Sequence, residues 1–125
     1  MLGSAHVVAF VATTDPAAAR SFYGDVLGLT LVDDSPFAVV FDANGTPVRV
    51  TVVPEAVIAP YTVLGWSVDD VEASIAALAA KGVTFERYDG LEQDELGIWT
   101  VPGGGARVAW FKDPEGNVLS LTQLA

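Results

Sequence analysis

The stretch DPAAARSFYGDVLG at residues 15–28 decides the architecture, because a second stretch, DDVEASIAALAAKG at 69–82, has the same length and similar limits. At the start of each, aspartate can cap a helix by accepting a hydrogen bond from a free backbone N–H. At the end of each, glycine can adopt the left-handed conformation that stops a helix. We therefore expect two helices, with apolar stripes made of Phe22, Val26 and Leu27 in the first and of Val71, Ile75, Leu78 and Ala79 in the second.

Apolar, β-branched segments surround each expected helix and predict strands. In the first half these are 5–12, 29–32, 37–41 and 48–53, and in the second half 62–68, 83–87, 106–111 and 117–123. The last two strands of each half are joined by an Asp-x-x-Gly turn, at 42–45 and 113–116. The sequence thus predicts an α+β fold in one domain, with two tandem β-α-β-β-β modules at about 1–58 and 59–125 that form curved mixed sheets around a cleft.

The charge balance excludes several kinds of partner. The 125 residues include 6 Lys or Arg and 16 Asp or Glu, which gives a net charge of −10. Such a field repels phosphate backbones and anionic lipids, so we expect no nucleic-acid or membrane partner. The acidity either keeps an apolar protein in solution or attracts a cationic ligand. With no membrane-spanning or leader-like segment in the sequence, we expect a cytoplasmic protein.

Two segments carry a family resemblance. Residues 15–29 (DPAAARSFYGDVLGL) and 110–121 (WFKDPEGNVLSL) resemble the vicinal oxygen chelate superfamily. That group includes glyoxalase I, extradiol dioxygenases, fosfomycin-modifying enzymes and bleomycin-resistance binding proteins. The resemblance covers essentially the whole chain, including its duplication. Because one module leaves a sheet face uncovered, we also expect a homodimer.

The resemblance further implies where a metal would be held. The ligand positions of the superfamily's enzymes match Val8, Arg49, Val63 and Ser120 in this chain. None of the four side chains is a carboxylate or an imidazole, which are the donors that such cations need. The chain has no cysteine and a single histidine, His6. We therefore expect no metal and no other cofactor, as in the metal-less binding-protein branch.

Two polar residues each allow more than one interpretation. His6 shares the strand face of Val8, and it is either exposed or bonded to backbone, or else a general base, since imidazole titrates near neutral pH. Arg49 is either exposed on an edge strand or placed in the cleft. In the cleft it would need an anion, supplied by Asp or Glu of the protein or by a ligand carboxylate or phosphate.

The aromatic residues give the most positive indication of function. The chain has 3 Trp, 3 Tyr and 6 Phe. Strand alternation places Phe10 with Val8, Tyr61 with Val63, and Trp66 toward the helix. Trp99 follows an acidic loop in a stretch without periodicity, where an indole suits stacking on a flat ligand. The alternative is that most of these rings fill the core and a dimer interface.

These observations favour a metal-independent protein that binds a small organic molecule, aromatic or cationic. The ligand-binding candidates are Trp99, Phe10, Tyr61, Arg49, His6 and Ser120. The resemblance to bleomycin-resistance proteins implies sequestration of an antibiotic or a related natural product, and it assigns no catalytic residue. Two other classes stay open: a metal-free isomerase or lyase with His6 as its base, and a non-catalytic structural homologue without a ligand.

Overall fold

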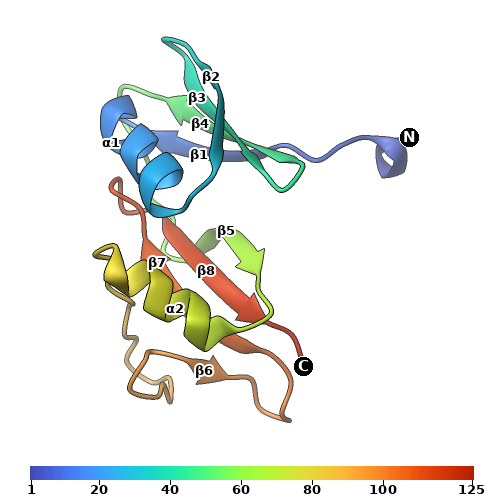
Figure 1. Ribbon diagram of the computed structural model, residues 1–125, viewed down its shortest axis with the longest axis vertical. Helices are drawn as coiled ribbons and strands as arrows, with labels where there is room; N and C mark the ends of the chain where they lie inside the picture. Colours follow the sequence, from blue (N-terminus) through green and yellow to red (C-terminus); the bar gives the residue numbers. More distant parts are fainter. The chain divides into compact units, whose positions relative to one another are not determined.

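Each half of the chain forms a four-stranded mixed sheet that carries one helix (Figure 1). The computed structural model describes all residues, 1–125, which divide into two units, Met1–Ile58 and Ala59–Ala125. Neither helix is long and apolar enough to cross a membrane.

The first unit contains β1 (Ala9–Thr13), α1 (Pro16–Arg20), β2 (Thr30–Asp34), β3 (Ala38–Ala43) and β4 (Thr46–Val52). A short 3-10 helix, Leu2–Ser4, precedes them, and a π-helical segment, Ser21–Val26, continues α1. The strand order is β1-β4-β3-β2, with β1 parallel to β4 and the other pairs antiparallel.

The second unit contains β5 (Thr62–Ser67), α2 (Val71–Ala80), β6 (Trp99–Thr100), β7 (Arg107–Lys112) and β8 (Val118–Gln123). Its strand order is β5-β8-β7-β6, and β5 is parallel to β8, as β1 is to β4 in the first unit. The two sheets therefore have the same topology, which confirms the predicted α+β fold with a duplicated β-α-β-β-β plan.

The helix limits follow from the capping residues. The side chain of Asp15 accepts a hydrogen bond from the N–H of Ala18 at 3.1 Å, and that of Asp70 accepts one from Ala73 at 3.0 Å. Each such cap stabilises a helix by roughly 0.5–2 kcal/mol. Gly28 and Gly82 follow the two helices with φ of 78° and 91°, values that glycine adopts without strain. Both predicted helices are confirmed in place; the first continues beyond Arg20 as the π-helical segment, and the residue that caps the second is Asp70.

The apolar stripe of the first helix differs from the prediction. Tyr23 and Ala19 are its buried residues, whereas Phe22, Val26 and Leu27 are only partly covered. The cause is the π turn, in which the Leu27 N–H donates to the Phe22 carbonyl five residues earlier, at 2.9 Å.

In α2 the predicted stripe is correct at its N-terminal end only. Val71 and Ile75 are buried, Leu78 is partly covered and Ala79 is exposed. The last turn of the helix therefore lies farther from the core than its first.

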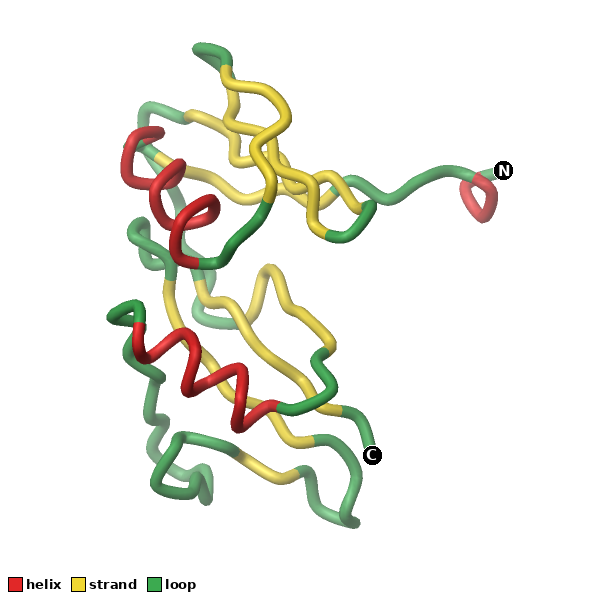
Figure 2. The backbone as a smooth tube through the Cα atoms, in the orientation of Figure 1, coloured by secondary structure: helices red, strands yellow, loops and turns green.

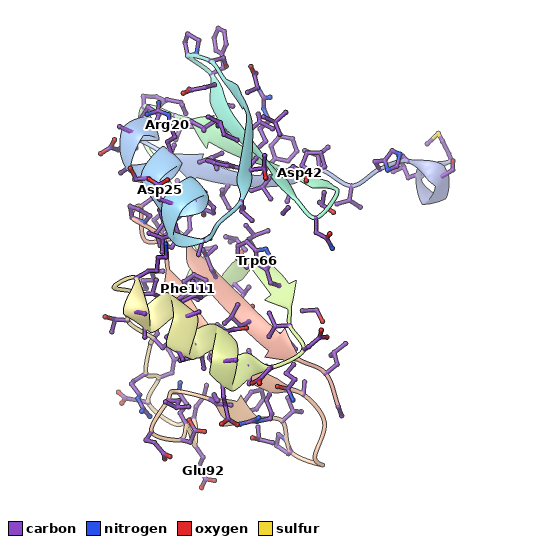
Figure 3. The ribbon with its side chains drawn as sticks, viewed as in Figure 1. Arg20, Asp25, Asp42, Trp66, Glu92 and Phe111 are labelled. Atoms are coloured by element: carbon purple, nitrogen blue, oxygen red, sulfur yellow. The ribbon has the colours of Figure 1, made fainter.

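Each unit buries its core between the sheet and the helix. In the first unit, Tyr23 packs against Phe41 of β3 with ring centroids 6.0 Å apart, and Val48 and Val50 of β4 lie beside Phe41 and Val39. In the second unit, Trp66 of β5 stacks on Phe111 of β7 at 6.5 Å (Figure 3). Trp66 thus faces the helix side of its sheet, as alternation predicts.

Two predicted strands are wrong in whole or in part. Residues 83–87 form no strand, and the chain from α2 to β6 is mostly loop (Figure 2). Two segments share the outer edge of β7. The Glu86 N–H donates one hydrogen bond to the Trp110 carbonyl, and Trp99 and Thr100 pair with the N-terminal end of β7.

The strand expected at 5–12 begins later, at Ala9. Its parallel partner β4 starts at Thr46 after the Asn44–Gly45 turn, and Pro47 has no N–H to donate. Residues 5–8 therefore have no strand to pair with and are exposed.

Candidate functional site

The face of the second sheet opposite α2, here called the open face, carries side chains that alternate with the core residues. On β7, Trp110 lies between Ala109 and Phe111, which are both fully buried on the helix side. Trp110 aligns across the sheet with Ser120 of β8, and Ser120 aligns with Gly65 of β5. These three residues form one row across the open face.

Three aromatic rings, called the aromatic cluster, meet at this row. Tyr88 lies edge-on to Trp110 with centroids 5.5 Å apart, and Trp99 is tilted against Trp110 at 6.1 Å. Both separations are within the range in which aromatic pairs attract one another beyond simple area burial. Contrary to the prediction of an irregular stretch, Trp99 begins β6 and pairs with Val108.

The indole of Trp110 is fixed by a hydrogen bond across the sheet. Its Nε1–H donates to the Oγ1 of Thr62 on β5 at 3.1 Å. Because β8 lies between β7 and β5, and adjacent strands are about 4.8 Å apart, the indole spans β8. Trp110 therefore lies along the open face and does not project from it.

Gln93 brings Tyr88 to the cluster by organising the loop between α2 and β6. Its side-chain oxygen accepts from the Tyr88 N–H at 2.8 Å, and its Nε2 donates to the carbonyls of Glu86 and Gly97, each at 2.9 Å. Asp94 then accepts from the N–H of Ile98 at 2.9 Å, one residue before Trp99. Side-chain hydrogen bonds therefore join the two ends of this loop to each other, and the backbone N–H of Glu86 joins the loop to the Trp110 carbonyl of β7.

Tyr88 contributes the titratable group of the aromatic cluster. Burial raises the pKa of its phenol, and the nearby Glu86 carboxylate raises it further. The phenol is therefore protonated throughout the neutral range and can donate a hydrogen bond.

Two pockets adjoin the aromatic cluster. One, of about 280 Å³, is lined by Pro60, Tyr61, Thr62, Tyr88, Trp110 and Val118. The other, of about 450 Å³, is lined by Gly90, Glu92, Asp94, Ile98, Trp99, Thr100 and Pro102. Glu92 projects from the loop at its rim (Figure 3).

The structure brings three of the six candidate ligand-binding residues to this region. Trp99 belongs to the aromatic cluster, and Tyr61, which is 67% exposed, lines the smaller pocket beside Trp110. Ser120 lies next to Trp110 in the row and is only 6% exposed.

The other three candidates lie in the first unit. Phe10 of β1, 61% exposed, aligns with Arg49 of β4. The expectation that Arg49 lies on an edge strand is wrong, because β4 lies between β1 and β3; Arg49 forms no ion pair. His6 is exposed, lies before β1 instead of within it, and makes no hydrogen bond.

The positions that correspond to the superfamily's metal ligands do not suit a metal. Val8 and Val63 are exposed valines, Arg49 is cationic, and Ser120 offers one neutral hydroxyl. No group of three His, Asp or Glu side chains gathers elsewhere in the chain. With this donor set, no metal-dependent step can be assigned to these positions.

Sequence reasoning missed Trp110 and Tyr88 as members of the site. Alternation with Ala109 and Phe111 could have identified Trp110 as a residue of the open face. No sequence signal identifies Tyr88, because its position depends on Gln93, which is five residues away in a loop.

The duplicated sheets, each with one helix-free face, define a class of paired β-α-β-β-β proteins. A model of the Glyoxalase/Bleomycin resistance protein/Dioxygenase superfamily matches residues 3–121. The chain therefore belongs to that superfamily, and the resemblance inferred from its sequence is confirmed.

Several solved structures are similar over nearly the full length. TnmS3, an antibiotic binding protein from Streptomyces sp. CB03234, is 26% identical with a TM-score of 0.74, covering 100% of this chain and 99% of that one. Lactoylglutathione lyase from Agrobacterium tumefaciens is 20% identical with a TM-score of 0.73, covering 96% and 93%. A superfamily member from Sphaerobacter thermophilus DSM 20745 is 22% identical with a TM-score of 0.74, covering 98% and 99%. No curated protein sequence matches the chain.

Proposed function

We propose that this chain is a metal-independent small-molecule binding protein whose ligand stacks a flat, conjugated part on the aromatic cluster. The observation that carries the proposal is the meeting of Tyr88, Trp99 and Trp110 on the open face, away from the core.

The position of the cluster supports binding over a purely structural role. Phe111, Leu119 and Val71 already fill the space between sheet and helix. The cluster lies on the other side of the sheet, where each of its rings is only partly covered. A flat ligand would bury the remaining aromatic area at a small cost in side-chain entropy, because these rings are held by their neighbours.

Sequestration of an antibiotic or a related natural product is the role that we propose for this binding. The similarity to TnmS3 supports it, since that protein is described as antibiotic binding and aligns with this entire chain. Binding alone removes a toxic compound when the protein exceeds both the compound and the dissociation constant. The net charge of −10 would favour ligands that carry positive charge outside the stacked part.

The enzyme alternative has less support. A general base must be held within hydrogen-bond reach of the proton that it removes. His6 is exposed, and no other side chain orients its ring.

The test is a fluorescence titration with bleomycin and a panel of polycyclic natural products, in which every compound is checked by mass for chemical change. Trp99→Ala should weaken binding by about 5- to 150-fold, the usual range for loss of a stacked aromatic anchor. His6→Ala should bind like the wild type, and Trp66→Phe, on the helix side, serves as the matched control. Unchanged affinity in both Trp99→Ala and Trp110→Ala would refute the site. Turnover by the wild type that His6→Ala abolishes would establish an enzyme.

A further inference from the structure

We propose that Ser120 determines ligand specificity, by donating a hydrogen bond from its hydroxyl to a carbonyl of a flat, uncharged, conjugated ring system. This proposal rests on the proposed function and identifies the chemical class of the part of the ligand that reaches the open face.

The first observation is the state of the Ser120 hydroxyl. The residue is 6% exposed, yet its Oγ makes no hydrogen bond within the chain. Every side-chain oxygen or nitrogen that is fully inaccessible to solvent has a hydrogen-bond partner. The Ser120 hydroxyl has none within the chain, so part of its surface is accessible to solvent. Water can pair with a hydroxyl in this position, and a ligand carbonyl that replaces the water would accept a neutral hydrogen bond from it.

The second observation is the absence of a side chain at Gly65, directly across from Ser120 on β5. A Cβ at this position would lie 2.7 Å from the Ser120 Oγ. Gly65 does not have a positive φ, so its backbone conformation does not require glycine. Glycine weakens a strand interior, and it often occurs there where another group must approach the backbone closely. Gly65 therefore leaves a path to the hydroxyl.

The third observation is the indole of Trp110, which lies beside that path. Trp110 aligns with Ser120 on the other side, and in such antiparallel pairs the Cβ atoms are about 5 Å apart. The hydrogen bond to Thr62 fixes the indole across β8. A group that reaches the hydroxyl must therefore pass along an aromatic surface, which favours a planar ring system.

The surrounding side chains define the charge of that ring system. The row of Gly65, Ser120 and Trp110 contains no charged residue. The row on one side of it is also uncharged and consists of Ser67, Thr122, Val108 and Trp99. The row on the other side contains one charged residue, Lys112, whose Nζ lies 3.5 Å from a carboxylate oxygen of Glu86. Because that charge is already paired, an ion beside Ser120 would lose its hydration without gaining a free counter-charge. The part of the ligand bound here is therefore neutral, and a conjugated carbonyl supplies the acceptor for the hydroxyl.

The experiment compares two probes that differ only at one carbon. Fluorenone and fluorene have the same fused planar rings, but fluorenone has a carbonyl where fluorene has a methylene. Equilibrium dialysis with the full chain measures the affinity of each. The wild type should bind fluorenone about 2- to 13-fold more tightly, the value of one neutral hydrogen bond. Ser120→Ala should lose that preference and keep the fluorene affinity, and Gly65→Ala should lose the preference by blocking the path.

The control is Ser74→Ala, the same change on α2, which should retain the wild-type preference. Circular dichroism and thermal melts verify that each variant is folded. Equal affinity of the wild type for the two probes, or a preference that persists in folded Ser120→Ala, overturns the role of Ser120 and leaves the proposed function standing. If the wild type binds neither probe nor any compound of the natural-product panel, the proposed function fails, and this proposal with it.

Discussion

Removal of the Gln93 side chain should release the loop that carries Tyr88 to the aromatic cluster. Gln93→Ala deletes three hydrogen bonds of 2.8, 2.9 and 2.9 Å and leaves one N–H and two carbonyls without their partner. At roughly 0.5–1.5 kcal/mol each, the loss amounts to about 1.5–4.5 kcal/mol. Since the loop has little regular structure, we expect the loss to appear as local opening more than as global unfolding.

The assay is amide hydrogen exchange at Glu86 and Asp94, whose N–H groups donate to the carbonyls of Trp110 and Ile98. Their protection should fall by about 10- to 1,000-fold, since each 1.4 kcal/mol corresponds to a factor of ten. Gln93→Glu should be at least as damaging, because it loses both donated bonds and places a charge near two carbonyl oxygens. Glu92→Ala, which removes an exposed neighbour that makes no hydrogen bond, is the control. If Gln93→Ala keeps wild-type protection at both amides, the reasoning about this loop is refuted.

Three further predictions concern the metal, the assembly and the response to pH. Elemental analysis of dialysed protein should find far less than one equivalent of Zn, Ni, Fe or Mn per chain, because the expected ligand positions are Val8, Arg49, Val63 and Ser120; a stoichiometric metal would contradict the position matching. Sedimentation should give a mass near twice 13.1 kDa, since Phe10, Val32 and Phe37 are exposed apolar side chains that a second copy could cover, and a clean monomer would contradict this. Burial, and to a smaller extent the Glu86 carboxylate, raises the pKa of Tyr88 above its usual 10.0. The protonated phenol therefore contributes to the stability of the folded state fully below about pH 10, and that contribution is lost as the pH rises through the raised pKa. Tyr88→Phe should therefore remove part of the alkaline destabilisation seen in urea titrations, and an identical pH profile for the variant would count against that role.

Local signals in the sequence predict the helices and turns well. Asp15, Asp70 and the glycines at 28 and 82 act on their own segments, so their effect does not depend on distant contacts. The Asp113 turn behaves in the same way, with the Asn117 N–H donating to the Asp113 carboxylate at 2.9 Å.

Features that depend on a partner strand are predicted less well. Residues 83–87 have an apolar pattern typical of a strand, yet only one hydrogen bond from Glu86 reaches β7, since β6 occupies the rest of that edge. Likewise, no sequence pattern around Phe22 indicates the π turn that makes Tyr23 the buried residue of its helix. Periodicity reports which side chains are apolar, but it does not report which hydrogen-bonding edges are free.

The candidate site contains residues that the sequence can identify and one that it cannot. Trp99 was identified from the sequence for its unexplained indole, and the structure adds Trp110 and Tyr88 as its neighbours. Trp110 follows from strand alternation, whereas Tyr88 depends on hydrogen bonds made by Gln93. Any ligand contact of Trp99, Phe10, Tyr61, Arg49, His6 or Ser120 stays a prediction.

The separation of core and open face bears on how such a protein diverges. All eight of the largest fully buried side chains lie between sheet and helix or on the helix itself, and none belongs to the rows of the open face. Under the proposed function, point substitutions at Gly65, Trp99 or Ser120 would alter ligand preference without disturbing the packed core. Ligand preference and stability would then be able to change independently of one another. The retention of the fold in structures only 20–26% identical to this chain accords with this independence.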